Sequence, residues 1–158
     1  MTDDYRQILD RLDALESEGA IRKLKATYMR WCDEKRGREI GDLFWEDGAW
    51  EAVGVTATVG RAAIADMFEA SPARLTFTVH YLTNESIDVH GDAATGRWKL
   101  LEPCTFRGEL PLWQGGWYLD DFERRDGVWK FARLRLKLDY RTPFDEGWVR
   151  TRFADLGK

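Results

Sequence analysis

Long segments of alternating apolar and polar residues fill the second half of the chain and constrain its fold more than any other feature. An alternation with a period of two is that of β-strands with one buried face. Short turn sequences at 90–92 and 125–127 read as hairpins, whereas Leu110-Pro111 marks a longer connection. A meander of long antiparallel strands is therefore predicted, with strands at 75–89, 93–106, 113–124 and 128–140.

The first half of the chain is predicted to be mainly helical, because its apolar residues recur at helical spacing. A β-branched stretch interrupts the helices and reads as a strand hairpin around Gly54. The predicted helices are 5–15, 21–33 after a break at 16–20, a short piece over 37–45, and 61–70, which Pro72 ends; the predicted hairpin strands are 49–53 and 55–59 after a turn at 46–48.

Helices followed by a meander of long strands are the order expected of an α+β domain, with helices on one face of a curved sheet. A chain of 158 residues has the length of one ordinary domain. We therefore expect a single domain over residues 1–158, with residues 1–19 as an N-terminal helix. We expect residues 143–158 to form a partly ordered tail that covers the domain or a neighbouring subunit.

Composition limits the partners and the location that we expect. The net charge is −4 with acidic and basic residues interspersed, which argues against nucleic acid or an anionic membrane as the main partner. The acidic N-terminus lacks the features of a signal peptide, and no apolar run approaches the roughly 20 residues of a membrane span. Two separated cysteines make no disulfide framework. We expect a soluble, cytoplasmic protein with reduced thiols.

The chain contains eight tryptophans, more than a core alone requires. They could line an apolar cavity for a hydrophobic small molecule, or they could fill the core and interfaces. The candidates for a cavity wall, each of which could equally be a core residue, are Trp31, Trp50, Trp98 and Trp117.

His80, in the strand-like run 76–84, is the leading candidate for a catalytic base, since histidine titrates near neutrality without help. Asp33 is its candidate partner. It ends a helix, where a carboxylate faces the negative end of the helix dipole at a cost of about 0.3–1 kcal/mol. A carboxylate on the second ring nitrogen would fix the tautomer and stabilise the imidazolium. The alternatives are a core or surface histidine and an exposed acid neutralised by Lys35 or Arg36.

Several other side chains could complete such a site. Tyr28 shares the apolar helix face and could donate a hydrogen bond to a leaving oxygen or an enolate, or could pack in the core. Arg133 and Arg135 share one strand face, where one could bind an oxyanion or a departing anion; otherwise both face solvent. Cys104 is a candidate substrate contact without an adjacent base. No metal-ligand or phosphate-binding pattern is present, so we expect no metal and no cofactor.

The segments 21–33, 44–50, 79–84 and 122–131 resemble the nuclear-transport-factor-2-like superfamily, in its branch of SnoaL-like (polyketide-cyclase-like) proteins. The similarity extends from Ile21 to about Phe144. It implies a cone-shaped α+β barrel, in which a curved mixed or antiparallel sheet wraps around N-terminal helices. Within this branch, the chain resembles enzymes of the hexachlorocyclohexane dehydrochlorinase, scytalone dehydratase and bile acid 7α-dehydratase types.

For Asp33 and His80, the resemblance implies a buried dyad inside the cone. Tyr28 stands where the dehydrochlorinases have a basic residue, as in the bile acid dehydratase type. The string Glu102-Pro103-Cys104 stands where scytalone dehydratase carries a second histidine, which argues against scytalone as substrate. The pocket arginine on the last strand would be Arg133 or Arg135.

The resulting hypothesis is a cofactor-independent lyase or isomerase that acts on a hydrophobic cyclic small molecule by His80-assisted proton abstraction. The alternative is a non-catalytic member of the same fold that binds a ligand or assembles with a partner, as the small subunits of ring-hydroxylating dioxygenases do. A third option, water activation as in limonene-epoxide hydrolase, lacks the expected Asp-Arg-Asp arrangement. We expect a homodimer or homotrimer, because the open face of such a sheet leaves apolar surface.

Overall fold

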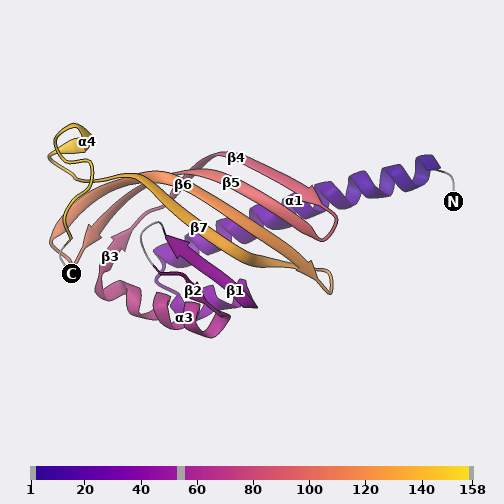
Figure 1. The fold of residues 1–158 in the computed structure, drawn as a ribbon, viewed down its shortest axis with the longest axis horizontal. Helices are drawn as coiled ribbons and strands as arrows, with labels where there is room; N and C mark the ends of the chain where they lie inside the picture. Colours follow the sequence, from indigo (N-terminus) through magenta and orange to yellow (C-terminus); the bar gives the residue numbers. More distant parts are fainter. Residues whose placement is uncertain (1–2, 53–55, 157–158) are drawn as a thin grey trace.

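A curled sheet built around three long strands dominates the computed structural model, which describes residues 3–52 and 56–156. The long strands are β5 (Ala93–Phe106), β6 (Leu110–Arg125) and β7 (Val128–Pro143), paired antiparallel over nearly their full lengths. The sheet has the order β2 (Thr58–Val59), β1 (Phe44–Ala52), β7, β6, β5 and β3 (Leu75–Thr78), and β4 (Tyr81–His90) also pairs with β5. The predicted meander of long antiparallel strands is confirmed (Figure 1).

The connection between β5 and β6 differs from the prediction. Instead of a longer link at residues 110 and 111, a tight turn follows Phe106, and Pro111 already pairs with Thr105. Arg107 and Gly108 make the turn with φ of 50° and 75°. This left-handed conformation is easy for glycine and uncommon for arginine. The pairing of two long strands outweighs that local cost.

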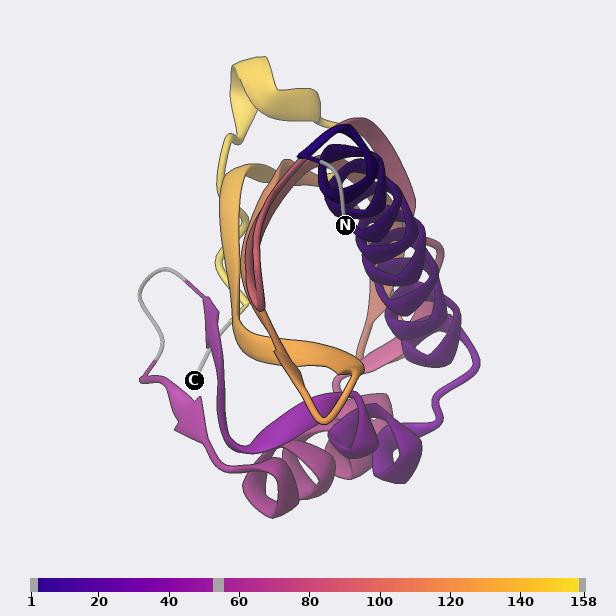
Figure 2. The same ribbon diagram turned by 90° about the vertical axis from the view of Figure 1, so that its right-hand side faces the viewer.

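Helix α1 (Asp3–Asp33) is one continuous helix of 31 residues, so the predicted break at 16–20 is wrong. Glycine inside a helix costs about 1 kcal/mol relative to alanine, which tertiary contacts can offset. One such contact is Arg124 on β6, which bonds to Asp13 at 2.6 Å and reaches the buried Ser17. In Figure 2, the curled sheet and α1 together outline a ring, with α1 along its open side.

The predicted short helix over 37–45 and turn at 46–48 are partly wrong. Helix α2 (Gly37–Asp42) ends earlier, and Phe44 begins strand β1 (Phe44–Ala52), which pairs parallel with β7. The Phe44 ring stacks on Phe131 at a centroid distance of 5.0 Å, and both rings are fully buried. Strand β2 (Thr58–Val59) pairs antiparallel with β1, as the predicted hairpin requires, although its tip at 53–55 lies outside the described residues.

The prediction of one strand over 75–89 is wrong at a single point. After helix α3 (Arg61–Ala70) and the short 3₁₀ helix η1 (Ser71–Ala73), the chain forms β3 (Leu75–Thr78) and β4 (Tyr81–His90). Both strands pair with β5, and between them Val79, next to His80, lies opposite Pro103 and donates its N–H to Pro103 O at 3.1 Å. Proline has no N–H to donate, so the ladder is interrupted there. His80 therefore lies at a gap in the sheet.

The tail folds back onto the sheet. Helix α4 (Gly147–Arg150) follows β7, and Phe153 then forms a parallel bridge with Arg141. Ala154 N donates to Arg141 O at 2.7 Å. None of the helices described in the structure is long and apolar enough to cross a membrane.

A buried ion pair fastens α1 to the sheet. Lys25 Nζ lies 2.7 Å from Asp120 Oδ2 on β6, and the two side chains are 1% and 0% exposed. The ammonium also lies 3.5 Å from the centre of the Tyr118 ring, in cation–π contact. Burial lowers the pKa of Lys25 and raises the pKa of Asp120 to about 6. Burying both charges costs desolvation free energy. Removing one charge should therefore destabilise the fold more than replacing both residues with apolar ones.

We predict that Asp120→Asn lowers the free energy of unfolding by about 3–5 kcal/mol, because it leaves the Lys25 charge buried without a counter-charge. The double variant Lys25→Met with Asp120→Leu should recover most of that loss, since it removes both charges. Urea unfolding followed by circular dichroism measures both. A double variant no more stable than Asp120→Asn would contradict this account.

Candidate active site

A cavity of about 680 Å³ lies inside the curled sheet. Its wall includes Tyr28 and Cys32 from α1, Phe68 from α3, and Leu136 from β7. The tail contributes the last part of the wall with Phe153, Ala154 and Leu156. A second hollow of about 640 Å³, more open and with charged walls, lies between α1 and β4. His80 lines both the cavity and the open hollow, and Asp33 also lines the open hollow, so these two residues lie at the wall between them.

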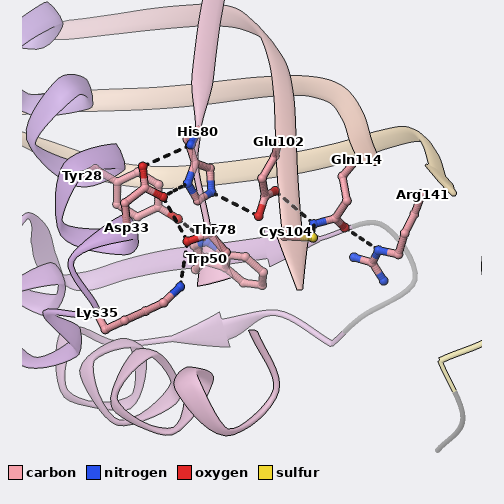
Figure 3. A network of polar contacts seen from close by, with 10 residues as sticks. All are labelled: Tyr28, Asp33, Lys35, Trp50, Thr78, His80, Glu102, Cys104, Gln114 and Arg141. Carbon is pink, nitrogen blue, oxygen red and sulfur yellow. Dashed lines mark hydrogen bonds and ion pairs between the residues drawn. The ribbon is translucent and has the colours of Figure 1, made fainter. Parts of the chain in front are cut away.

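Asp33 and His80 are in direct contact at this wall, as Figure 3 shows. His80 Nδ1 lies 2.6 Å from Asp33 Oδ1, and the backbone N–H of His80 donates to Asp33 Oδ2 at 3.1 Å. The His80 side chain is 8% exposed and the Asp33 side chain is 28% exposed. With the ring proton on Nδ1, the carboxylate is the acceptor and the lone pair of Nε2 remains free. The arrangement can therefore accept a proton at Nε2.

The hydrogen bonds around Asp33 favour its ionised form. Thr78 Oγ1 donates to Asp33 Oδ1 at 3.0 Å, and Lys35 Nζ in turn donates to Thr78 Oγ1 at 2.7 Å. Burial raises the pKa of Asp33, but the hydrogen bonds from His80 and Thr78 outweigh it and hold this pKa below its ordinary value. The same bonds offset the unfavourable position of a carboxylate at a helix C-terminus.

The end of α1 is shaped to bring these groups together. Arg36 N bonds to Trp31 O and Lys35 N to Cys32 O, the two bonds of a Schellman motif. Lys35 takes the left-handed conformation at φ 60°, a position usually given to glycine. The motif turns the chain back so that the Lys35 side chain reaches Thr78 on β3.

A chain of polar side chains continues from His80 into the cavity (Figure 3). His80 Nε2 lies 3.7 Å from Glu102 Oε1. Gln114 Nε2 donates to Glu102 Oε2 at 3.0 Å and to Cys104 Sγ at 3.2 Å, while Gln114 Oε1 accepts from Arg141 Nε. Burial raises the pKa of Glu102, which is only 3% exposed, and lowers the pKa of Arg141.

Glu102, Gln114 and Arg141 belong to the candidate site, although none of them was among the predicted site residues. A signal existed for the first two: the alternation along β5 and β6 places Glu102 and Gln114 on the buried face. No such signal existed for Arg141. A bulge in β7, where Leu138 pairs with Gly116 but Tyr140 with Gly115, shifts the alternation and places Arg141 in the cavity wall.

Among the predicted wall residues, Tyr28 and Trp50 do line the cavity. Trp50 Nε1 donates to the Tyr28 hydroxyl at 2.9 Å, and burial raises the pKa of Tyr28 well above its ordinary value, so the phenol stays protonated. Cys104 lies just behind the wall, bonded to Gln114; burial raises the pKa of its thiol to about 12. Trp98 packs in the core over Lys25, outside this cavity.

The remaining predicted residues lie away from the cavity. Trp31 packs beside the core under Arg36. Trp117 lies on the outer side of the sheet between Arg97 and Lys99. Arg133 and Arg135 pair with Glu51 and Asp121 and are 49% and 37% exposed, so the alternative in which both face outward is the observed one. The arginine that β7 brings to the cavity is Arg141.

A sequence profile of the SnoaL-like domain matches residues 13–135. The chain belongs to the SnoaL-like domain family. It is 28% identical over 137 residues to hexachlorocyclohexane dehydrochlorinase 1 of Sphingobium indicum, covering 84% of this chain and 88% of that protein. An uncharacterised protein of Mycobacterium bovis is 28% identical over 130 residues, covering 80% of this chain and 84% of that protein.

Solved structures of similar proteins have the same fold. A hexachlorocyclohexane dehydrochlorinase from Novosphingobium barchaimii superposes with a TM-score of 0.79 at 28% identity, covering 85% of this chain and 94% of that chain. A putative scytalone dehydratase from Novosphingobium aromaticivorans superposes with a TM-score of 0.75 at 26% identity, covering 83% and 89%, respectively. The predicted α+β cone is confirmed. Within residues 3–52 and 56–156, no cluster of three His, Cys, Asp or Glu side chains could hold a metal ion.

The depressed pKa of Asp33 predicts how its contribution to stability depends on pH. A lowered folded-state pKa stabilises the protein above the ordinary value of 3.8, and this stabilisation is lost as the pH falls through the lower folded-state value. We predict that Asp33→Asn is less stable than the wild type at pH 7, and that the difference shrinks below pH 3.8. Urea unfolding at several pH values measures this, with the exposed Asp66→Asn as control. A difference that is constant down to pH 2 would contradict it.

Proposed function

We propose that the protein is a cofactor-independent lyase that removes a proton from carbon and expels a neighbouring leaving group from a hydrophobic cyclic small molecule. The contact between His80 and Asp33 at the cavity wall is the observation that carries this proposal. The relatives whose names describe dehydrochlorinases support a lyase, because dehydrochlorination is an elimination. Isomerisation would need the same first step.

The proposed base is His80. Its Nε2 lone pair takes the proton while Asp33 holds the Nδ1–H and stabilises the imidazolium. Because Asp33 stays ionised through its bonds to Thr78 and the His80 backbone, the tautomer with Nε2 free is favoured. General base catalysis of this kind contributes on the order of 10²–10⁴-fold, so positioning in the cavity must provide much of the remaining acceleration.

Two further groups could stabilise negative charge that develops on the substrate. Tyr28 stays protonated and can donate to a ligand oxygen, since Trp50 already provides a donor to its own oxygen. Arg141 lines the cavity and is fixed through Nε by Gln114, which leaves its terminal nitrogens for a ligand anion. Leu112, Leu136 and Phe106 make the wall apolar between these groups.

The non-catalytic alternative has less support. It would be favoured by Asp33 and His80 pointing apart or by tryptophans that fill the cavity. In the structure the two side chains are 2.6 Å apart, and Trp50 is the tryptophan at the cavity wall within the described part of the chain. Both observations favour catalysis over ligand storage or assembly alone.

We predict that His80→Ala lowers turnover by on the order of 10²–10⁴-fold, because the base is lost. The protein should remain folded, because His80 is not part of the hydrophobic core. The assay tests elimination from a panel of cyclic substrates that includes γ-hexachlorocyclohexane. Halide release and product absorbance measure the turnover. Free imidazole should restore part of the activity. His90→Ala, an exposed residue at the end of β4, is the matched control. Full activity in His80→Ala would refute the assignment.

We also propose that copies of the chain associate through the N-terminal half of α1. This half projects beyond the sheet in Figure 1, and it exposes Tyr5, Ile8, Leu12 and Leu15 by 52%, 59%, 49% and 64%. Their spacing alternates between three and four residues, which is the spacing of coiled-coil seams. The second copy would cover this stripe.

We predict that the wild type sediments as an oligomer and that Leu12→Glu dissociates it, because a buried charge is placed in the seam. Arg6→Glu, at a position of the helix that faces away from this stripe, should leave association intact. Analytical ultracentrifugation measures both. A wild type that sediments as a single chain would refute this proposal.

A further inference from the structure

We propose that Glu102 is the general acid of this site and protonates a hydroxyl leaving group, so that the natural reaction is a dehydration. This inference rests on the proposed function, because it needs His80 as the base. The Glu102 side chain lies on the inner face of β5 and lines the cavity. Its Oε1 is 3.7 Å from His80 Nε2, so one substrate could contact both groups.

The neighbours of Glu102 direct one of its oxygens into the cavity. Arg141 Nε donates to Gln114 Oε1, which fixes the orientation of the Gln114 amide. The Gln114 NH₂ group must then face Glu102, and it donates to Oε2 at 3.0 Å. Oε1 is left on the side of His80 and the cavity. A carboxyl group held in this way can carry its proton on Oε1 while Oε2 accepts from Gln114.

The surroundings of Glu102 raise the pKa of its carboxyl group. Burial raises its pKa, and the Asp33 carboxylate acts in the same direction, while His80, Arg141 and Lys35 oppose them. The overall shift is upward. Asp33 and Glu102 thus occupy opposite environments around one histidine, an arrangement in which one carboxyl group stays ionised and the other can donate a proton.

A proton donor beside the base distinguishes between leaving groups. A halide departs as a stable anion and needs no proton, whereas an alcohol oxygen must be protonated to leave as water. Dehydrochlorination would not use Glu102 as an acid, although burying a carboxyl group beside His80 costs free energy. The arrangement therefore fits a substrate with a hydroxyl group on the carbon next to the acidic C–H.

His80 Nε2 takes the proton from carbon, the C–H electron pair forms the C=C bond, and the C–O bond breaks as Glu102 gives its proton to the oxygen. Water leaves, with His80 as imidazolium and Glu102 as carboxylate. The water formed in this step can bond to both His80 Nε2 and Glu102 Oε1, which are 3.7 Å apart, and relay the proton from the first to the second, which restores both groups without an external proton source. Base and acid lie on the same wall, so the hydrogen and the hydroxyl leave from the same face.

The test uses two probes that differ only in the leaving group, 3-hydroxycyclohexanone and 3-chlorocyclohexanone, which give the same enone. Enone absorbance measures turnover above the uncatalysed rate. Glu102→Gln keeps the acceptor for Gln114 but cannot donate the acidic proton. We expect it to lower dehydration by on the order of 10²–10⁴-fold and to change chloride elimination little. Glu109→Gln, in the exposed turn between β5 and β6, is the matched control.

The outcomes separate this inference from the proposed function. His80→Ala should slow both eliminations, whereas Glu102→Gln should slow the dehydration alone. Equal losses in both reactions for Glu102→Gln would reduce Glu102 to a positioning residue and overturn the inference alone. A wild type that converts neither ketone would overturn both proposals for this substrate class. Infrared difference spectra at pH 7 add a readout without substrate: a protonated carboxyl band that is absent in Glu102→Gln supports the inference, and an ionised Glu102 overturns it.

Discussion

The buried ion pair between Lys25 and Asp120 fixes α1 against the sheet, and the geometry of the cavity depends on it. The ammonium lies among aromatic rings with its counter-charge 2.7 Å away, so a helix that slid or rotated would leave two buried charges unpaired. Asp33 lies on the same helix, about two turns and roughly 12 Å further along. The ion pair, which lies outside the cavity, thus determines whether Asp33 reaches His80. Tyr28, which lies between Lys25 and Asp33 on the helix, faces the cavity.

The need to pair buried polar groups also organises the cavity itself. Asp33, His80, Glu102, Gln114 and Arg141 form one continuous chain, in which each group limits the protonation state or orientation of the next. Because the wall around them is largely apolar, each interaction is stronger than it would be in water, and each unpaired group would be more costly. The result is two carboxyl groups on either side of one imidazole, with pKa values shifted in opposite directions.

Much of the fold could be predicted from the sequence, and the errors have identifiable causes. Strand β5 was predicted with its observed limits, since alternation is a local property of the chain. The break in α1 and the helix through Phe44 were wrong because contacts with β6 and β7 outweigh local propensity. In the candidate site, the proximity of Asp33 and His80 was anticipated through the family resemblance. Arg133 and Arg135 lie on the outward face of β7. A bulge between them and Arg141 reverses the alternation, so that Arg141 faces the cavity instead.

The sequence by itself determined the types of element, the inward alternation of β5 and β6, and the kinds of chemical group available. These follow from the period of apolar residues and from side-chain chemistry, both of which are local. Only the tertiary structure decided which groups meet. Asp33 and His80 are 47 residues apart in the sequence. His80 lies in the gap between β3 and β4, beside the point where Pro103 interrupts the ladder. Glu102 becomes a candidate site residue because it lies 3.7 Å from His80. Bulges and the rotation of a helix depend on packing between distant segments, and the pattern within one element does not show them.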